Sequence, residues 1–233
     1  MSTARVKCRV LVDFDGTIAP TDTTDLLLER FAEPEWHSIE DDWKAGRIGS
    51  RECLVRQIDL VRATPTEMDS FMNSIEIDPG FSRFVDFVQG LGYPIAVVSD
   101  GLDRTIGNVL DRNNIDIEYF ANRLEWRGGN RWRLSFPHAR SDCSALSGNC
   151  KCSFAEGQPR QLKVLVGDGR SDFCLAGRAD LVLAKSGLLN HCRKNDLPHI
   201  AFEDFNQVTT LFARWLAEHV TGPAVSARAS EAE

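Results

Sequence analysis

The chain has 233 residues and a formal net charge of -7, and 42% of its residues are hydrophobic. This length is sufficient for one hydrophobic core and a smaller appended domain. The acidic balance argues against nucleic acid as a partner, because nucleic-acid binders usually present a basic face. No apolar run is long enough to cross a bilayer, and no signal peptide is recognisable. We therefore expect a cytoplasmic protein without a membrane partner, whose seven cysteines are thiols or metal ligands rather than disulfides.

The first half of the chain changes character twice. Residues 8–14 are rich in Val and Leu and end at a glycine-containing turn, which predicts a buried strand. Residues 21–77 instead carry apolar side chains at helical spacing among many charges. They predict a helical module of about four helices, which ends at Pro79-Gly80.

The second half alternates between helical and strand-like patterns. Periodicity predicts helices over residues 81–89 and 103–112, and buried strands over residues 95–98, 163–166 and 181–184. Glycines between Trp-bearing flanks predict a hairpin in residues 124–136, and a loop rich in Cys, Ser and Gly follows. This alternation is typical of an α/β fold with a Rossmann-like parallel sheet. We assign residues 1–20 and 78–220 to the core and residues 21–77 to a helical cap, and we expect a disordered tail over residues 221–233.

Polar residues stand where three expected strands end. Asp13 and Asp15 follow the first strand, Ser99 the second and Asp168 the third. Ligands of open α/β sheets bind outside the carboxyl ends of the strands, and carboxylates suit Mg²⁺. The alternatives are an acidic surface turn and a calcium loop, but the twelfth position of such a loop, counted from Asp13, is Thr24 rather than Glu.

The run Asp13-Phe14-Asp15-Gly16-Thr17 resembles the first motif of the haloacid dehalogenase-like (HAD) phosphohydrolase superfamily. The resemblance implies a HAD fold with a cap inserted after the first strand. It also implies that Asp13 attacks phosphorus to form an aspartyl-phosphate. Asp15 would act as general acid and base, and its backbone carbonyl would bind Mg²⁺. An acid at this position favours phosphoryl transfer, because the leaving alkoxide needs a proton and the later water must lose one.

The other motifs of the superfamily follow in order. Ser99 would hydrogen-bond a phosphate oxygen. The segment 167–172 resembles the acidic motif, in which Asp168 would bind Mg²⁺ and Asp172 would bind it directly or hold a ligand in place.

A lysine must balance the nucleophile and the phosphoryl oxygens. The candidates are Lys151 and Lys163. Lys163 stands near the start of the strand that ends at Asp168, and therefore at the opposite edge of the sheet. Lys151 lies on the loop that returns to this strand, as the lysine of the family does, so we choose Lys151 as the catalytic lysine.

The helical insertion is similar to that of the phosphoserine-phosphatase-like branch, and the resemblance covers about residues 9–212. Residues 31–36 and the Cys-rich loop resemble the methionine-salvage phosphatases of 2-hydroxy-3-keto-5-methylthiopentenyl-1-phosphate. Residues 99–100, 166–169 and 172–174 look more like phosphoethanolamine/phosphocholine phosphatases. The expected partner is therefore a small phosphomonoester, and the substrate class stays open.

Ser99-Asp100-Gly101 stands where the salvage enzymes have Ser-Gly-Gly, and we assign these three residues to substrate binding. A carboxylate at Asp100, beside the phosphate pocket, would favour a cationic leaving group. The alternative is that Asp100 caps the helix that begins near Asp103.

The Cys-rich loop offers candidate zinc ligands in His138, Cys143, Cys150 and Cys152. Their spacing is not that of a common zinc finger, and the alternative is a packed loop around Lys151. The other cysteines fall in apolar contexts and are expected in the core: Cys8, Cys53, Cys174 and Cys192.

Two other classes of function fit the same motifs. One is a phosphate-binding regulator without turnover, and the other is a phosphotransferase that passes the phosphoryl group to a sugar. The oligomeric state is not predicted by any of these patterns.

Overall fold

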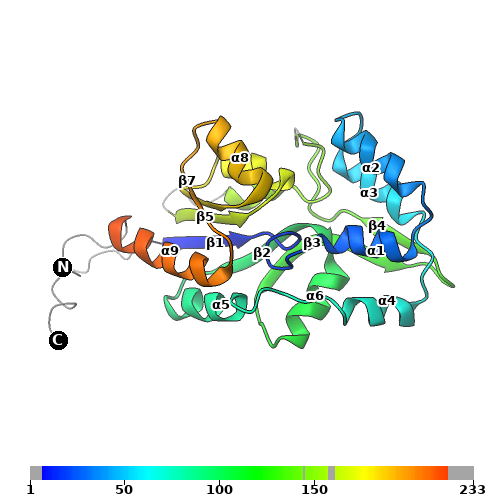
Figure 1. The fold of residues 1–233 in the computed structure, drawn as a ribbon, viewed down its shortest axis with the longest axis horizontal. Helices are drawn as coiled ribbons and strands as arrows, with labels where there is room; N and C mark the ends of the chain where they lie inside the picture. Colours follow the sequence, from blue (N-terminus) through cyan, green and yellow to red (C-terminus); the bar gives the residue numbers. More distant parts are fainter. Residues whose placement is uncertain (1–6, 144, 157–160, 220–233) are drawn as a thin grey trace.

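The structure, a computed structural model, describes residues 7–143, 145–156 and 161–219. A central sheet has the strand order β4-β3-β2-β1-β5-β6-β7 (Figure 1). Neighbouring strands pair in parallel, except that β3 and β4 are antiparallel, which confirms the predicted α/β fold. The strands are β1 (Lys7–Val12), β2 (Ile95–Leu102), β3 (Glu118–Trp126), β4 (Trp132–Ser135), β5 (Gln161–Gly167), β6 (Leu181–Ala184) and β7 (His199–Ala201).

Helices connect the strands and form the predicted helical module. The module holds α1 (Thr23–Phe31), α2 (Trp36–Lys44), α3 (Ser50–Ile58) and α4 (Pro65–Met72). The remaining helices are α5 (Phe81–Gly90), α6 (Asp103–Arg112), α7 (Phe173–Ala176), α8 (Ser186–Lys194) and α9 (Phe205–His219), with 3-10 turns η1 (Lys151–Ala155) and η2 (Arg170–Asp172).

Local sequence explains where the helices of the module begin. Asp22 caps α1 by accepting hydrogen bonds from the backbone N–H groups of Thr24 and Asp25. Thr64 and Glu67 form a reciprocal capping box at α4. Each cap satisfies N–H groups that the helix itself leaves without acceptors.

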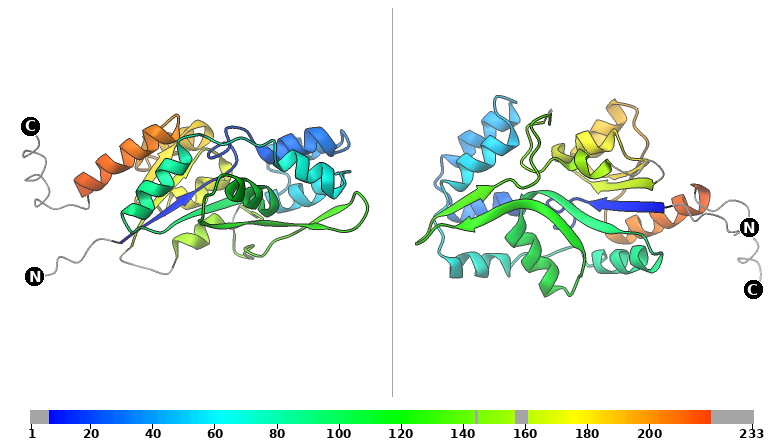
Figure 2. Two further views of the ribbon diagram at one scale, coloured as in Figure 1. Left: turned by 90° about the horizontal axis from the view of Figure 1, so that it is seen from below. Right: turned by 180° about the vertical axis from the view of Figure 1, so that it is seen from behind.

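Alternate residues of the central strands pack on opposite faces of the sheet. In β1, Val10 and Val12 join the larger apolar cluster, which includes α5, α6 and α9. Leu11 joins the smaller cluster, which includes α7 and α8. Figure 2 shows helices on both faces of the sheet. Because both faces are covered, these strands are apolar throughout, which is why they read as continuous hydrophobic runs.

Three of the differences from the sequence prediction concern β2, β3 and β7. β2 extends to Leu102 rather than ending at Ser99, β3 begins at Glu118, and β7 was not predicted. The β2–β3 pairing changes register between Val98 and Leu102. A strand with such an irregularity loses its regular apolar pattern, so its polar end resembles a turn in the sequence.

The helical module packs on the β3–β4 hairpin, which lies below α2 and α3 in Figure 1. The indole N–H of Trp132 donates to the carbonyl of Ala63 at 2.7 Å. The larger apolar cluster includes Leu27, Leu54 and Met68 of the module together with strand residues. The division into a cap and a core remains our interpretation, and the expected tail 221–233 lies outside the described residues. Among the described helices, none combines the length and apolarity required to span a membrane.

Candidate active site

The pairing of β1 with β5 brings the first and last acidic motifs together. Val12 pairs with Val166, so Asp13 and Asp168 follow neighbouring strand ends. The turn between β1 and α1 passes close to Asp168 at Gly16, which has a φ of +69°. A Cβ at Gly16 would lie 2.4 Å from an Asp168 carboxylate oxygen, so both the backbone conformation and the space require glycine.

Lys151 lies between two carboxylates at the centre of the site. Its Nζ is 2.6 Å from Asp13 Oδ2 and 2.8 Å from Asp172 Oδ1, and its side chain is 1% exposed. Burial alone would lower the pKa of Lys151, but the two carboxylates outweigh it and raise the pKa above its ordinary value. Lys151 therefore carries a fixed positive charge.

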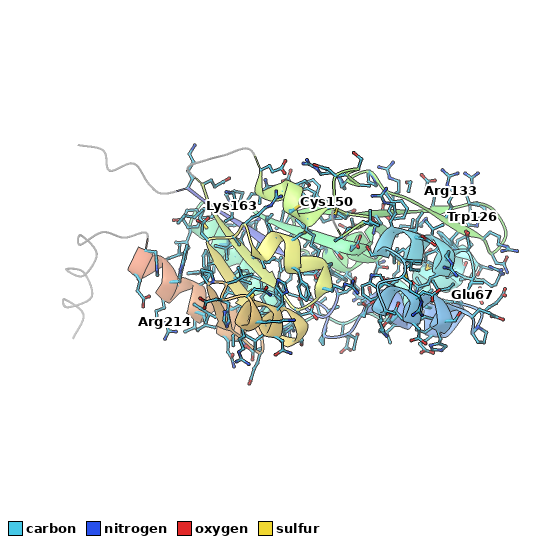
Figure 3. The ribbon with its side chains drawn as sticks, turned by 90° about the horizontal axis from the view of Figure 1, so that it is seen from above. Glu67, Trp126, Arg133, Cys150, Lys163 and Arg214 are labelled. Carbon is cyan, nitrogen blue, oxygen red and sulfur yellow. The ribbon has the colours of Figure 1, made fainter. Side chains whose placement is uncertain are left out.

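Lys163, the other candidate, lies in β5, where its backbone N–H donates to Asp180. Figure 3 shows Lys163 toward the end of the sheet opposite the helical module, whereas Cys150, next to Lys151, lies nearer the module. The distance along the strand separates Lys163 from the carboxyl ends at which Asp13 and Asp168 meet.

Three acids form a group around Lys151. One oxygen each from Asp13, Asp168 and Asp172 lies within 4.8 Å of the others. Asp168 also accepts a hydrogen bond from the Thr17 hydroxyl at 3.0 Å. Burial and the Asp172 carboxylate raise the pKa of Asp168 to about 6, because like charges crowd the site.

Asp172 is fully buried and uses both oxygens in protein contacts. Oδ1 accepts from Lys151, and Oδ2 accepts from the backbone N–H groups of Asp168 and Gly169 at 3.2 Å each. Of the two roles expected for Asp172, these contacts favour holding the loop and the lysine over direct metal binding.

Three acids and one lysine leave the cluster with excess negative charge. Burial and the Asp172 carboxylate raise the pKa of Asp13, and Lys151 opposes this rise only in part. A divalent cation would offset this charge, and the oxygen donors are the ligand type that Mg²⁺ prefers. The residues present therefore fit Mg²⁺.

Asp15 faces the cavity from the turn after β1. Its Oδ1 accepts from the backbone N–H and the hydroxyl of Thr23 at 2.8 and 2.6 Å. Burial, followed by the Asp22 carboxylate, raises the pKa of Asp15 to about 7. A carboxyl group with such a pKa can both donate and accept a proton near neutral pH.

Gly101 leaves room for Asp15. A Cβ at this position would lie 2.3 Å from Asp15 Oδ2 and 3.1 Å from Ser99 Oγ. We expect Gly101→Ala to lower kcat by about a hundredfold, because it displaces Asp15 while the fold is kept. Gly90→Ala is the matched control, since a Cβ there meets no atom within 4 Å. Steady-state kinetics and thermal unfolding of both variants test this expectation, and near-normal kcat in Gly101→Ala would contradict it.

Asp100 joins three segments rather than capping a helix. Its carboxylate accepts from Ser50 Oγ at 2.6 Å, from Asn149 N at 2.8 Å and from Asn122 Nδ2 at 3.0 Å. Ser50 begins α3 of the helical module, so this acid ties the module to the sheet. The helix-cap alternative is wrong, because the residue that precedes α6 is Leu102 and no side chain caps this helix.

Ser99 lies in β2 and is 1% exposed. Its Oγ accepts the backbone N–H of Gly101 at 2.9 Å, and its carbonyl accepts from Asn149 Nδ2. Asn122 and Asn149 hold the irregular end of β2 in place. Neither residue was predicted from the sequence, although Asn149 immediately precedes the Cys150-Lys151 pair.

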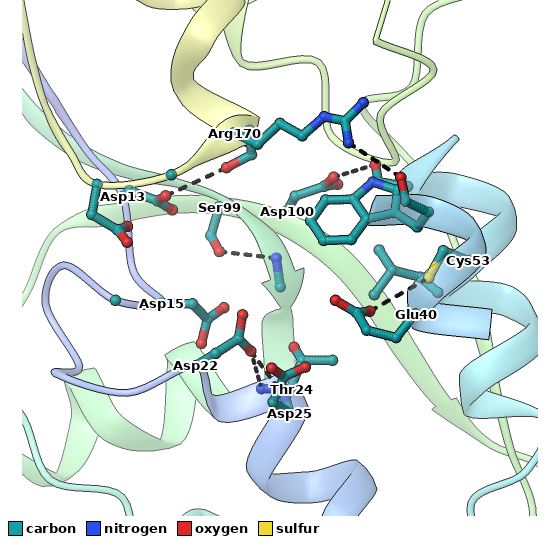
Figure 4. A pocket seen from close by; sticks show the side chains of 18 of the residues that line it. Asp13, Asp15, Asp22, Thr24, Asp25, Glu40, Cys53, Ser99, Asp100 and Arg170 are labelled. Atoms are coloured by element: carbon teal, nitrogen blue, oxygen red, sulfur yellow. Dashed lines mark hydrogen bonds between the residues drawn. The ribbon is translucent and has the colours of Figure 1, made fainter. Parts of the chain in front are cut away.

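These residues line a cavity of about 390 Å³ between the sheet edge and the helical module. Figure 4 shows Asp13, Asp15 and Ser99 on one side and Glu40 with Cys53 on the other. Arg170 lies at the rim of the cavity. Its guanidinium donates a hydrogen bond to the backbone carbonyl of Trp43, and its Cζ lies 5.4 Å from the centroid of the Trp43 ring. The residues expected at the site from the sequence thus line the cavity or contact residues that line it, as Lys151 and Asp172 do.

The module side of the cavity carries further acids that were not predicted from the sequence: Asp22, Asp25 and Glu40. Glu40 accepts from the amide of Gln57 at 3.0 Å and pairs with Lys44 at 3.3 Å. Burial, then Asp22 and Glu40, raise the pKa of Asp25 to about 7. This side of the cavity therefore has a negative character of its own.

Comparisons with known proteins identify the family. The model of the haloacid dehalogenase-like hydrolase family matches residues 10–177. The 2-hydroxy-3-keto-5-methylthiopentenyl-1-phosphate phosphatase of Geobacillus thermodenitrificans is 33% identical over 202 residues, which cover 84% of this chain and 91% of the relative. The enzyme of the same name from Geobacillus kaustophilus is 31% identical over 207 residues, covering 87% and 94%.

Solved structures share the fold. A substrate-bound phosphoserine phosphatase superposes with a TM-score of 0.67 at 22% identity, covering 89% of this chain and 99% of that chain. A phospho-aspartyl intermediate analogue of phosphoserine phosphatase gives a TM-score of 0.65 at 22% identity, covering 92% and 99%. With a family model that spans most of its length and with relatives above 30% identity, the chain belongs to the haloacid dehalogenase-like hydrolase family.

Proposed function

We propose that the protein is a Mg²⁺-dependent phosphomonoesterase that works through an aspartyl-phosphate on Asp13. The observation that carries this proposal is the buried Lys151 Nζ, held 2.6 Å from Asp13 Oδ2 beside the acidic cluster. Lys151 neutralises part of the charge that accumulates when a carboxylate approaches a phosphoryl group. Mg²⁺, held by Asp13, Asp168 and the backbone carbonyl of Asp15, would supply the remaining positive charge.

The chemistry proceeds in two displacements. An Asp13 oxygen attacks phosphorus, the bond to the leaving-group oxygen breaks, and Asp15 donates a proton to this oxygen. In the second step Asp15 removes a proton from water, whose oxygen attacks phosphorus, and the bond to Asp13 breaks to release phosphate. Ser99 would donate to a phosphoryl oxygen in both steps, because this residue lines the cavity.

For the substrate we propose 2-hydroxy-3-keto-5-methylthiopentenyl-1-phosphate, the compound in the names of the relatives above. The cavity offers Leu54, Cys53 and Trp43 as apolar contacts for a methylthio chain. The test is a comparison of kcat/KM for this compound with kcat/KM for phosphocholine, phosphoethanolamine and phosphoserine. A preference for any of the last three by tenfold or more would contradict the assignment.

Turnover of p-nitrophenyl phosphate with Mg²⁺ separates an enzyme from a phosphate-binding regulator. Phosphate release in water without a sugar acceptor separates hydrolysis from phosphotransfer.

The acids on the module side favour a second candidate, a phosphomonoester with a cationic leaving group such as phosphocholine or phosphoethanolamine. A cation in the cavity would relieve the crowding of Asp25 by Asp22 and Glu40. If so, Asp25→Asn should lower kcat/KM for phosphocholine several-fold and leave that for a neutral phosphoester unchanged. Asp41→Asn, an exposed acid of α2 outside the cavity, is the control. An equal effect on both substrates would remove this candidate.

Dependence on metal gives a further expected result. Activity should be lost in excess EDTA and return with Mg²⁺, because the acidic cluster needs a divalent cation to bind an anionic substrate. Ca²⁺ should inhibit, since it accepts more ligands in looser geometry and would engage both oxygens of Asp13. Turnover measured at a fixed substrate concentration with each metal checks this expectation, and full activity in EDTA would contradict it.

A cytoplasmic location of the protein is part of the same proposal.

A further inference from the structure

The Cys-rich loop packs around Lys151 and does not gather the zinc ligands considered from the sequence. Cys143, Cys150 and Cys152 form a buried cluster, whereas the ring of His138 packs edge-to-face against Phe120. Within the described residues, the side chains close enough to share a metal ion are the acids of the site: Asp13, Asp168 and Asp172. The packed-loop alternative is therefore favoured.

Arg170 carries the only positive charge among the residues that line the cavity, all of which belong to the described part of the chain. Lys151 does not line the cavity, and its charge is paired with Asp13 and Asp172. The cavity wall otherwise carries acids, both at the sheet edge and on the module: Asp13, Asp15, Asp22, Asp25, Glu40, Asp100 and Asp168. A phosphate monoester that enters therefore meets like charge on most sides.

The turn that carries Arg170 is held in place by Asp172. The Oδ2 atom of this acid accepts hydrogen bonds from the backbone N–H groups of Asp168 and Gly169 at 3.2 Å each. The Arg170 side chain extends from this turn toward the module (Figure 4). Its Nη1 reaches the backbone carbonyl of Trp43 in α2 at 3.2 Å. The guanidinium therefore stands at the cavity mouth, between the sheet edge and the module.

No carboxylate of the described residues compensates the charge of Arg170. Its exposed guanidinium contacts Trp43, through the backbone carbonyl and the ring, and both of these groups are neutral. Arg47, by contrast, pairs with Asp42 at 2.8 Å. A guanidinium has five N–H donors, and the described residues accept from one of them at Arg170. The remaining donors and the charge are available to a ligand.

We propose that Arg170 selects the anionic phosphoryl group of the substrate at the mouth of the cavity. This inference rests on the proposed function and adds to it a residue that determines specificity. A guanidinium can bind two phosphoryl oxygens at once, and its charge raises the local concentration of anions. Lys151 acts at Asp13 once the substrate is bound. Arg170 therefore acts on the approach of the substrate and the departure of phosphate rather than on the chemical steps.

Trp43 keeps the guanidinium at the mouth, because the negative face of an indole ring attracts a cation that lies 5.4 Å from its centroid. A purely structural alternative is that Arg170 only ties the module to the sheet edge through Trp43. Selection requires the positive charge, whereas the tie requires the contacts of the planar guanidinium. Lysine keeps the charge and loses the planar group, so its substitution for Arg170 separates the two roles.

The test compares Arg170→Met, Arg170→Lys and a control, Arg214→Met, in the turnover of p-nitrophenyl phosphate with saturating Mg²⁺. Arg214 is an exposed residue of α9 at the end of the molecule opposite the module (Figure 3), so the control removes the same charge far from the cavity.

Arg170→Met should lower kcat/KM about five- to tenfold at low ionic strength and leave kcat within about twofold, because a charge at the rim acts mainly on association. In about 0.5 M KCl this loss should shrink to about twofold, because salt screens exposed charges. Arg170→Lys and Arg214→Met should each keep at least about half of kcat/KM, because each retains a positive charge at the mouth.

Binding of inorganic phosphate, measured by calorimetry with Mg²⁺ present, reports on the same residue without turnover. The dissociation constant should rise several-fold in Arg170→Met and stay unchanged in Arg214→Met. A protein that binds phosphate in this way but hydrolyses no monoester would contradict the proposed function and support the role of Arg170. An active enzyme with the same phosphate affinity and kcat/KM in Arg170→Met would overturn that role. An equal loss in Arg170→Met and Arg170→Lys, or a loss that persists at high salt, would overturn it as well.

Discussion

Asp13→Asn is expected to lower kcat by at least about a thousandfold. The asparagine amide keeps the shape of the side chain but cannot form the aspartyl-phosphate, and it is a poorer ligand for Mg²⁺. Because Lys151 keeps Asp172 as a partner at 2.8 Å, the fold should survive this change. Steady-state kinetics with saturating Mg²⁺ measures the loss, and thermal unfolding reports on the fold.

The matched control is Asp86→Asn, which removes an exposed carboxylate of α5 that does not line the cavity. This control should keep kcat within about twofold, as most surface substitutions do. If Asp13→Asn kept a kcat near that of the control, Asp13 would not be the nucleophile.

Lys151→Met is expected to affect both catalysis and stability. Removal of one partner from a buried ion pair costs about 3 kcal/mol of unfolding free energy, because Asp13 and Asp172 lose the charge that balances them. The loss of kcat should be about a hundred- to a thousandfold, the effect of removing one preorganised positive group from a charged transition state.

Lys163→Met is the control that separates the two candidate lysines. Lys163 lies in β5, away from the acidic cluster, so its replacement should leave kcat and the unfolding free energy nearly unchanged. Denaturant titration and steady-state kinetics on both variants show which of the two lysines is catalytic. A larger kcat loss in Lys163→Met than in Lys151→Met would reverse our assignment.

Much of the site was accessible from the sequence because its residues stand at the ends of apolar strands. Val10, Leu11 and Val12 form an uninterrupted apolar run, since β1 is covered on both faces. The acids that follow such a run must lie at one edge of a parallel sheet. The sequence alone therefore predicted that Asp13 and Asp168 lie close together, and the motif around Asp15 indicated the family.

The choice of Lys151 depended on the same topological argument and on the resemblance to the family. A lysine at the start of β5 cannot reach residues at its end, so a lysine on the returning loop was preferred. The structure places Lys151 Nζ between Asp13 and Asp172. The sequence did not reveal that Asp172 uses both oxygens in protein contacts, because these contacts depend on the turn at Asp168 and Gly169.

The sequence alone thus determined what local patterns encode, namely the alternating strands and helices, the helical module and the acidic motifs. Only the tertiary structure decided which distant side chains meet. Asp100 contacts Ser50 across the boundary with the module, and Cys174 of α7 packs against the cluster of Cys143, Cys150 and Cys152, from which β5 separates it in the sequence. Such contacts depend on how connections pack over the sheet. The free energy of that packing is distributed over many apolar contacts, so no short segment specifies it.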